Sequence, residues 1–231
     1  VTIYEKSNRL GGVFNEAASF TFKEKDRDLI QYYCTQMKKY NIDIRLNTEI
    51  KNLDSLDADE IIIATGNVSE RKLHIPGGDK CIAALEFLSN GMKCGEQVIV
   101  IGGGLTGCEI AYELAKEGKQ VTIVEAQDDI LKVVGSSMAN TSYLRDAFEY
   151  YKVPVYTEAK VLEVTDTAVV MEDSNGKKQM IPAETMVVSI GYENGTSFDA
   201  DKKNIHVIGD AKKIGNLYGA ILDANELVIT L

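Results

Sequence analysis

The hydrophobic pattern in the middle of the chain predicts a strand, a helix and a second strand in close succession. Val98–Ile101 is an unbroken apolar run, typical of parallel strands that are buried on both faces. Small and apolar residues then recur at helical spacing over about Leu105–Glu117, and Gly118 is placed to end that helix. Val121–Val124 follows with the pattern of another buried strand. The stretch therefore predicts a βαβ unit with parallel strands.

The turn between the first strand and the helix has the spacing G-x-G-x-x-G. Its glycines are Gly102, Gly104 and Gly107, and Leu105 and Thr106 lie between the last two. Glycine lets the chain turn tightly and lets a pyrophosphate lie against the main chain, while the amino end of the helix attracts phosphate. A turn that is glycine-rich for unrelated reasons is the alternative. Strand, glycines, helix and strand in register favour a dinucleotide site.

The second strand ends in Glu125, whose carboxylate is placed to accept the hydroxyls of an adenosine ribose. Asp128 and Asp129 follow, and no arginine lies nearby in the sequence. Acidic groups without an arginine repel a ribose 2′-phosphate. The sequence therefore favours NAD(H) over NADP(H).

Two pairs of similar segments indicate that the nucleotide-binding unit occurs twice. VTIYE at Val1–Glu5 matches VTIVE at Val121–Glu125, and EIIIATG at Glu60–Gly66 parallels TMVVSIG at Thr185–Gly191, at offsets of 120 and 125 residues. Two copies of one unit explain both matches. In the second copy, the strand, glycine turn and helix precede VTIVE. We therefore expect their counterparts in about 23 residues upstream of Val1, in a longer polypeptide.

The first segment then enters a nucleotide-binding fold at its second strand, Val1–Tyr4, with Glu5 as the ribose-binding acid. A polar turn containing Lys6, Arg9 and Gly12 follows. After a ribose acid, we interpret this turn as backbone that passes beside a cofactor phosphate. A flexible loop is the alternative.

Two further pairs of residues follow apolar strands at positions where open α/β sheets bind ligands, beyond the carboxyl ends of the strands. Thr65 and Gly66 come after the buried strand Ile61–Ile63. Gly209 and Asp210 come after a strand near the end of the chain. Asp210 is interpreted as an acceptor for a sugar-type hydroxyl of the first cofactor, with a turn or capping aspartate as the alternative.

The remaining patterns predict the other elements. Helices are expected at Asp26–Tyr40, Ile82–Leu88, Asn140–Tyr151 and from about Asn216. The first is expected to face the core with Leu29, Ile30, Tyr33, Cys34 and Met37, the third to dock on the sheet, and the last to have an apolar face of Leu217, Ala220, Ile221, Ala224 and Val228. Strands are expected at Ile42–Leu46, Val153–Tyr156, Val161–Val164, Ala168–Glu172, Gln179–Ile181, Met186–Ile190 and Ile205–Ile208. Gly191 comes directly after the strand Met186–Ile190.

Composition limits the classes of partner. The net charge of −10 and the isoelectric point near 4.8 argue against nucleic acid and against an anionic membrane, because phosphate surfaces bind basic faces. No run approaches the roughly 18 apolar residues of a membrane span. Four cysteines without C-x-x-C spacing favour a reducing, cytoplasmic compartment and exclude a motif-borne redox disulfide. No metal-binding or nucleophilic catalytic set is singled out.

Together, VTIYEK, RLGG, EIIIATG, VIVIGGGLTGCEIA, VTIVE and VIGDA resemble the flavoproteins that bind FAD on one nucleotide-binding domain and NAD(P)H on the other. LGGVFNEAA, KEKDRDLIQYY and GDAKKIGN look most like the carboxyl-terminal part of the NADH:flavin oxidoreductase group, which includes 2,4-dienoyl-CoA reductase, enoate reductase and trimethylamine dehydrogenase. The resemblance covers nearly the whole chain.

The resemblance implies roles for the residues that match its motifs. NAD(H) would bind at the glycine turn and Glu125, with Glu109 near the nicotinamide side. FAD would bind at Glu5 and Asp210, with Lys6, Arg9 and Gly12 near Glu5, and Thr65 and Gly66 would lie beside the bound dinucleotides. Gly191 and Gly209 are also expected to bind cofactor. Electrons would pass from nicotinamide to flavin and on to an iron–sulfur and FMN barrel domain amino-terminal to this chain. The cofactors would carry the redox chemistry, so no protein catalytic residue is assigned.

The expected fold is α/β with two Rossmann-like units, in which an NAD(P)-binding domain at 74–191 is inserted into an FAD-binding domain at 1–73 and 192–231 that lacks its first strand. The expected function is an NADH-oxidising module of a multidomain flavin oxidoreductase. A structural domain that keeps the fold, perhaps with a bound ADP moiety, is the alternative. Without the first glycine turn, we expect this chain to bind FAD weakly or not at all while its NAD unit stays intact.

Overall fold

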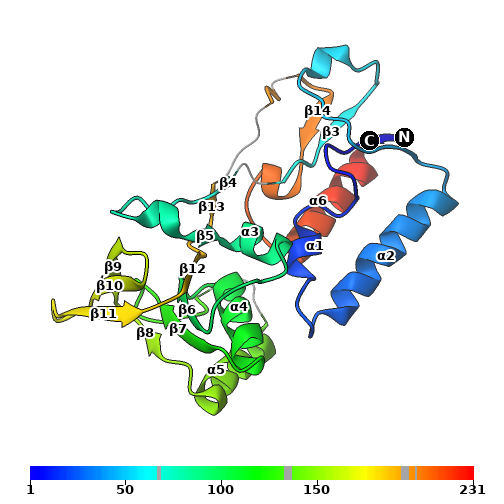
Figure 1. Ribbon diagram of the computed structural model, residues 1–231. Coiled ribbons are helices and arrows are strands. Elements are labelled where there is room, and N and C mark those ends of the chain that lie inside the picture. The colour runs from blue at the N-terminus through cyan, green and yellow to red at the C-terminus, as the bar shows by residue number, and fades with distance from the viewer. Residues whose placement is uncertain (67–68, 133–136, 194–197, 201) are drawn as a thin grey trace. The chain divides into compact units, whose positions relative to one another are not determined.

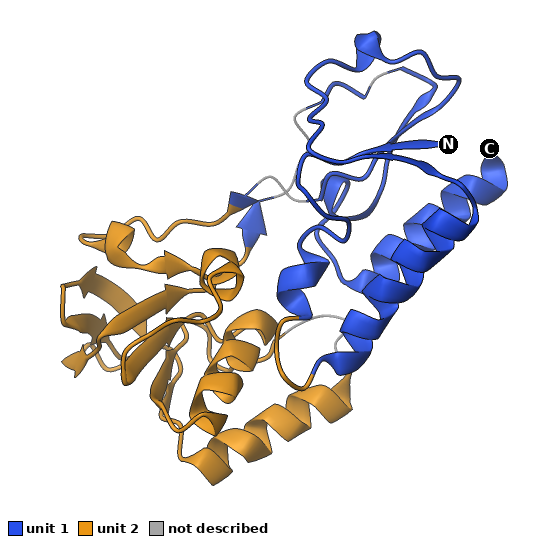
Figure 2. Cartoon of the chain, turned by 45° about the vertical axis from the view of Figure 1, so that its right-hand side comes forward, with its two compact units in different colours: residues 1–18, 23–69, 192–231 blue, residues 19–22, 70–191 orange. Residues whose placement is uncertain are grey.

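The computed structural model describes residues 1–66, 69–132, 137–193, 198–200 and 202–231. These residues form two compact units, coloured separately in Figure 2. Unit 1 comprises Val1–Ala18, Lys23–Ser69 and Tyr192–Leu231, and unit 2 comprises Ser19–Phe22 and Glu70–Gly191. The sequence analysis expected residues 19–22 and 70–73 in the FAD-binding domain, whereas in the structure they belong to unit 2. The chain therefore crosses between the units more often than a single insertion requires.

Unit 2 is built on a five-stranded parallel sheet with strand order β5-β12-β6-β7-β8 (Figure 1). The residues of the central strand β6 from Val98 to Ile101 are all buried, as the unbroken apolar run predicts. The prediction of an α/β fold with a parallel sheet is confirmed. The strands are β5 (Ile82–Ala83), β12 (Thr185–Val188), β6 (Gln97–Ile101), β7 (Gln120–Val124) and β8 (Val155–Tyr156).

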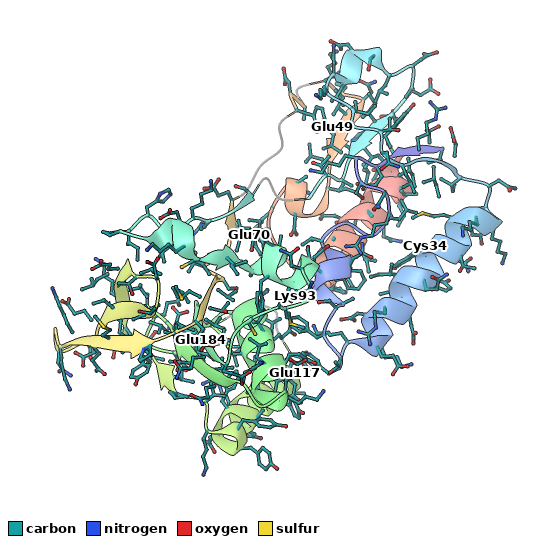
Figure 3. The ribbon with its side chains drawn as sticks, in the orientation of Figure 1. Cys34, Glu49, Glu70, Lys93, Glu117 and Glu184 are labelled. Carbon is teal, nitrogen blue, oxygen red and sulfur yellow. The ribbon has the colours of Figure 1, made fainter. Side chains whose placement is uncertain are left out.

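Three helices accompany this sheet: α3 (Ala84–Ser89), α4 (Leu105–Lys116) and α5 (Met138–Tyr151). Helix α4 connects β6 to β7, and its residues from Gly107 to Ala115 are all buried. The prediction that Ile82–Leu88 is entirely helical is wrong at its start, because Ile82 and Ala83 pair with β12 as an edge strand. Glu70 accepts the backbone N–H of Leu85 at 3.0 Å in the first turn of α3 (Figure 3).

A three-stranded antiparallel sheet, order β11-β10-β9, carries the second apolar cluster of this unit. Gly176 has a left-handed φ of 75° in the turn between β10 and β11, where the Asp173 carboxylate accepts the N–H groups of Asn175 and Lys177 at 3.0 Å. The strands are β9 (Lys160–Val164), β10 (Ala168–Glu172) and β11 (Lys178–Pro182). A short 3₁₀ helix, Gly78–Lys80, precedes β5.

The segment Ser19–Phe22 belongs to unit 2 although the residues on both sides belong to unit 1. Phe20 is completely buried in the apolar cluster that also contains α3, α4 and α5. Phe22 stacks on Phe20 and meets the Tyr112 ring edge-on, with ring centroids 5.3 and 5.2 Å apart. Thr21 accepts a hydrogen bond from the Lys116 amine at 2.6 Å. Burial of the Phe20 ring and the contact of Phe22 with Tyr112 explain why the segment joins unit 2.

The described residues of unit 1 contribute to three separate two-stranded sheets, and in one of these the division between the units falls after Ser69 of the strand Ser69–Glu70. The buried apolar cluster of unit 1 is small, with Ile63, Ile205 and Ala211 at its centre. The pairs are β1 (Thr2–Tyr4) with β2 (Asp43–Arg45), β3 (Ile61–Ile63) with β14 (Ile205–Val207), and β4 (Ser69–Glu70) with β13 (Tyr192–Glu193). Its helices are α1 (Phe14–Ala17), α2 (Glu24–Lys39) and α6 (Leu217–Thr230), with 3₁₀ turns at Leu53–Ser55 and Gly209–Ala211.

The residues expected to face the core from α2 are not fully buried: Leu29, Ile30, Cys34 and Met37 are half-buried, and Tyr33 is exposed. No described residue of α6 is buried either, and Ile221 and Val228 of its apolar face are exposed. An apolar helix face requires a sheet to cover it. The two parallel pairs in this unit are too small to do so.

The sequence repeat explains why the sheet of unit 1 is divided. The repeat aligns β1 with β7 and β3 with β12, and in unit 2 these counterparts lie on either side of β6. Removing β6 from the order β8-β7-β6-β12-β5 would leave two parallel pairs, which is the pairing that β2-β1 and β3-β14 show in unit 1. The described part of unit 1 thus contains no counterpart of β6. No helix in the described ranges is long and apolar enough to cross a bilayer.

Candidate nucleotide-binding site

The glycine turn of unit 2 lies at the junction of β6 and α4, as its spacing predicts (Figure 1). Gly102 follows β6 with a φ of 111°, a conformation that residues with a Cβ rarely adopt. A Cβ on Gly102 would also lie 2.1 Å from the carbonyl oxygen of Ser189, at the end of the neighbouring strand β12. The turn can therefore be this tight only with glycine at position 102.

Gly104 leaves open space at the amino end of α4. A Cβ on Gly104 would meet no atom of the chain within 4 Å, and no side chain caps the helix. The N–H groups of Leu105 and Thr106 come first in the helix, where intrahelical acceptors are lacking. Uncapped N–H groups and the positive end of the helix dipole favour an anion at this point.

Gly107 brings α4 close to the strand that precedes it. A Cβ on Gly107 would lie 2.1 Å from the carbonyl oxygen of Gly102 and 3.3 Å from Cγ1 of Val100. The next residue, Cys108, is completely buried, and its thiol donates to the carbonyl oxygen of Gly103 at 3.3 Å. Burial raises the pKa of this thiol to about 12. The glycine and the small neutral thiol together let the helix pack against the turn.

Glu125 contacts the glycine turn directly from the end of β7. Its Oε2 accepts the backbone N–H of Gly103 at 2.5 Å, and its Oε1 accepts the backbone N–H of Gln127 at 2.7 Å. The residue is 8% exposed. Each carboxylate oxygen can accept a second hydrogen bond, so Glu125 retains acceptor capacity for a ribose hydroxyl.

The role of Gly103 was missed in the sequence analysis, which used only the three glycines of the spacing. Its N–H binds Glu125, its carbonyl oxygen accepts the Leu131 N–H at 2.7 Å, and a Cβ at this position would lie 2.5 Å from Cγ2 of Ile130. The signal was present in the sequence as three consecutive glycines. The additional glycine lets the segment after β7 fold back onto the turn.

The sequence analysis found no arginine close to Glu125, Asp128 and Asp129 in the sequence, but the structure brings Arg145 against Asp129. Arg145 on α5 reaches the segment after β7 and donates to both carboxylate oxygens of Asp129 at 2.9 Å. It also donates to the carbonyl oxygen of Ile130 at 2.8 Å. Lys132 pairs with Asp128 at 2.5 Å. Both aspartates after Glu125 are therefore paired with cations.

Two other expected site residues lie in unit 2. Gly191 has a φ of 97° and lies three residues beyond β12, at the same end of the sheet as the glycine turn, because Ser189 donates its N–H to the carbonyl oxygen of Ile101 at 2.7 Å. Glu109 lies in the first two turns of α4 and is buried. Gly191 thus follows the strand next to β6, and Glu109 lies on the helix that begins at the glycine turn.

The expected residues of unit 1 form two groups on separate sheets. In the first, Glu5 follows β1 and accepts the N–H of Ser7 at 2.7 Å. Lys6 is exposed, Arg9 pairs with Glu16 at 2.5 Å, and Gly12 has a left-handed φ of 49°. These residues surround the turn that leads into α1.

The second group lies beyond β3 and β14, which are paired in parallel with Ile63 opposite Val207. By this register, Thr65 and Gly66 lie at the same end of the pair as Gly209 and Asp210. Asp210 accepts the Gly215 N–H at 3.1 Å. The two groups of unit 1 are not joined by sheet hydrogen bonds in the described residues.

Comparison with known proteins is consistent with this geometry. Residues 44–210 match the family described as pyridine nucleotide-disulphide oxidoreductase. Among relatives, the chain is 38% identical over 234 residues to a cinnamate reductase of Clostridium sporogenes, with 98% of this chain and 35% of the relative covered. It is 28% identical over 236 residues to an NADH oxidase of Thermoanaerobacter brockii, with 96% of this chain and 36% of the relative covered.

Among solved structures, a complex of 2-naphthoyl-CoA reductase with 2-naphthoyl-CoA superposes with a TM-score of 0.85 at 27% sequence identity. The match covers 100% of this chain and 36% of that protein. The chain thus spans about a third of the length of the relatives that it matches.

Proposed function

The chain belongs to the pyridine nucleotide-disulphide oxidoreductase family, and we propose that it is the NADH-oxidising, nucleotide-binding module of a larger flavin oxidoreductase. The observation that carries this proposal is the open, uncapped amino end of α4 at Gly104, with Glu125 bound to the adjacent Gly103. An anion site and a sugar-binding carboxylate on one turn fit the two polar parts of an adenine dinucleotide.

In this proposal, unit 2 binds NAD(H). Gly102, Gly104 and Gly107 let the pyrophosphate approach the main chain, and the N–H groups of Leu105 and Thr106 bind its oxygens. Glu125 accepts the ribose hydroxyls. Glu109 and Gly191 lie toward the nicotinamide. When bound, the nicotinamide supplies the hydride, and the protein binds and orients it.

Unit 1 is proposed as the FAD-binding half. Glu5 would accept the adenosine ribose hydroxyls, and Asp210 would accept a hydroxyl of the ribityl chain. Each has one carboxylate oxygen engaged by a backbone N–H, of Ser7 and Gly215 respectively, and therefore retains acceptor capacity. The remaining members of this set are Lys6, Arg9, Gly12, Thr65, Gly66 and Gly209.

The full-length protein is proposed to pass electrons on to a reductase centre for enoate or dienoyl substrates, in an amino-terminal barrel domain that carries FMN and an iron–sulfur cluster. Two relatives support this substrate class by name, the cinnamate reductase and the 2-naphthoyl-CoA reductase, and the chain matches about a third of each. Those names belong to the relatives, and we extend their substrate class to this protein as part of the proposal.

A structural domain without electron transfer remains the second candidate. The open glycine turn of unit 2 favours the first candidate, since a silent domain has no need of an unobstructed Gly104.

Anaerobic reduction of the full-length protein by NADH separates the two candidates. The proposed function predicts that NADH bleaches the flavin absorbance within the turnover time of the enzyme. It also predicts that Gly104→Val, which would fill the open space at the turn, abolishes bleaching by NADH but not by dithionite. Flavin that stays oxidised with NADH and is reduced by dithionite in the unaltered protein would support the structural domain instead.

A further inference from the structure

The segment from Ala126 to Lys132, which we call the β7–α5 segment, lies against the glycine turn. Leu131 donates its N–H to the carbonyl oxygen of Gly103 at 2.7 Å, and the Ile130 side chain occupies the space beside Gly103. Glu125 is bound to both, because its two carboxylate oxygens accept the N–H groups of Gly103 and Gln127. The segment therefore borders the position at which a ribose held by Glu125 would lie.

Arg145 holds this segment by three hydrogen bonds. The guanidinium group donates to both oxygens of Asp129 and to the carbonyl oxygen of Ile130, at distances of 2.8 to 2.9 Å. The forked, planar guanidinium matches a carboxylate in two parallel bonds, and it matches a phosphate group in the same way. Asp129 thus occupies the donors of Arg145 that could bind a phosphate.

The charges on the segment are balanced in pairs. Arg145 pairs with Asp129, and Lys132 pairs with Asp128. Hydrogen bonding to Arg145 lowers the pKa of Asp129 below its ordinary value, so this carboxylate is ionised at neutral pH. Glu125 accepts two backbone N–H groups, and within the described part of the chain no cation forms an ion pair with it. The Glu125 carboxylate would therefore repel a 2′-phosphate on a ribose that it held.

We propose that Asp129 is a specificity-determining residue, which occupies Arg145 and so prevents it from binding the 2′-phosphate of an adenine dinucleotide. Arg145 is then a latent phosphate-binding residue. The inference rests on the proposed function of unit 2, because it concerns the ribose of the dinucleotide bound there. It adds two roles to the proposed function: Asp129 disfavours NADP(H), and Arg145 would bind the 2′-phosphate of NADP(H) if Asp129 were absent.

An alternative role for the pair is purely structural, since Arg145 also joins α5 to the segment through Ile130. The two roles differ in what removal of Asp129 does. Loss of a structural contact weakens binding of both dinucleotides in parallel. Release of Arg145 from Asp129 changes the preference between them, because only one carries a 2′-phosphate.

Calorimetric titration of the full chain with NAD⁺ and with NADP⁺ measures this preference. We expect Asp129→Ala to bind NADP⁺ about tenfold more tightly than the unaltered chain and NAD⁺ with an affinity changed by less than about threefold, since one good charge-assisted contact is worth roughly a factor of ten. The double variant Asp129→Ala with Arg145→Gln should lose the gain. The fold should survive, because the side chains of Arg145 and Asp129 are 42% and 49% exposed.

Asp166→Ala is the matched control. Asp166 also forms an ion pair at the surface of unit 2, with Lys80, but in the turn between β9 and β10. The substitution removes the same charge from the chain, and both affinities should stay within about twofold of their original values. A gain in NADP⁺ affinity of similar size in this variant would overturn the inference, because it would reflect net charge alone.

Two further results would overturn the inference while leaving the proposed function in place. One is an unchanged ratio of the two affinities in Asp129→Ala, and the other is a parallel loss of both. A chain that bound neither dinucleotide before any substitution would refute the proposed function and the inference with it.

Discussion

The carboxylate of Glu125 accepts the backbone N–H of Gly103 at a distance of 2.5 Å, 22 residues apart in the chain. This hydrogen bond joins the end of β7 to the turn after β6. It places the residue expected to bind a ribose next to the backbone expected to bind a pyrophosphate. The spacing between the two parts of the proposed site is therefore set by the protein before any nucleotide binds.

Substitution of Glu125 tests this arrangement. We expect Glu125→Gln to bind NADH about tenfold more weakly, because a hydrogen bond to a charged acceptor contributes roughly 1.5–3 kcal/mol. Glu125→Ala should bind still more weakly and should also unfold at a lower temperature, since the Gly103 N–H loses its acceptor. Calorimetry and thermal unfolding measure the two effects. NADH affinity unchanged in Glu125→Gln would show that this carboxylate does not bind the ribose.

A pair of glycine substitutions separates binding from folding. Gly104→Ala should fold with a stability loss below about 1 kcal/mol, because the new Cβ meets no atom and φ at this position is −69°. It should nevertheless reduce NADH affinity by more than about tenfold by crowding the pyrophosphate. Gly107→Ala should instead lower the free energy of unfolding by about 2 kcal/mol or more, because its Cβ would lie 2.1 Å from a backbone oxygen.

Thermal unfolding and NADH titration of both variants check this contrast. If Gly104→Ala bound NADH as tightly as the unaltered chain, the open space at α4 would not be the pyrophosphate site. Equal loss of stability in the two variants would mean that the turn has no space in front of Gly104.

Cys108 should react slowly with alkylating reagents in the folded chain. Burial raises the pKa of Cys108 from 9.0 to about 12, so near pH 8 its thiolate fraction is about a thousandfold below that of an unperturbed thiol. We expect iodoacetamide to label Cys34 on α2 (Figure 3) well before Cys108, as read by mass spectrometry of peptides over time. Because the folded-state pKa is raised, the contribution of Cys108 to stability is complete below pH 9 and falls as the pH rises toward 12. Rapid labelling of Cys108 near pH 8 in the folded chain would contradict the expectation.

The chain described here should purify without stoichiometric flavin. The described residues of unit 1 contain no counterpart of β6, and its sheet is divided into β2-β1 and β3-β14. The edge at which a flavin nucleotide would bind is then discontinuous. The visible absorption spectrum of the purified chain, compared with its protein content, measures bound flavin. One flavin per chain would show that unit 1 is complete enough to bind FAD.

Sequence analysis predicted unit 2 well because its signals are local. An apolar run, three glycines at fixed spacing and a terminal acid specify β6, α4 and β7 without reference to distant residues. The resemblance to flavoproteins with two nucleotide-binding domains is confirmed by the family match over residues 44–210. The expected roles of individual site residues stay predictions.

The parts that sequence analysis missed depend on contacts between distant residues. Ile82 and Ala83 fit a helical pattern as well as a strand, and only pairing with β12 decides between the two. Arg145 lies on the polar face of α5, and its spacing along the helix does not reveal that it meets Asp129, 16 residues earlier. The apolar faces of α2 and α6 predicted burial, but the sheet that would bury them is divided.

The burial of Phe20 has a practical consequence for anyone who wishes to study the second unit alone. A gene fragment that encodes only residues 70–191 is continuous, but it omits an aromatic ring that fills the interior beside α4. Loss of a buried phenylalanine leaves a void that typically costs 3–5 kcal/mol, a large share of the stability of a domain of this size. The excised domain would therefore be a poor substitute for the intact chain unless the tetrapeptide Ser19–Phe22 were grafted back onto it.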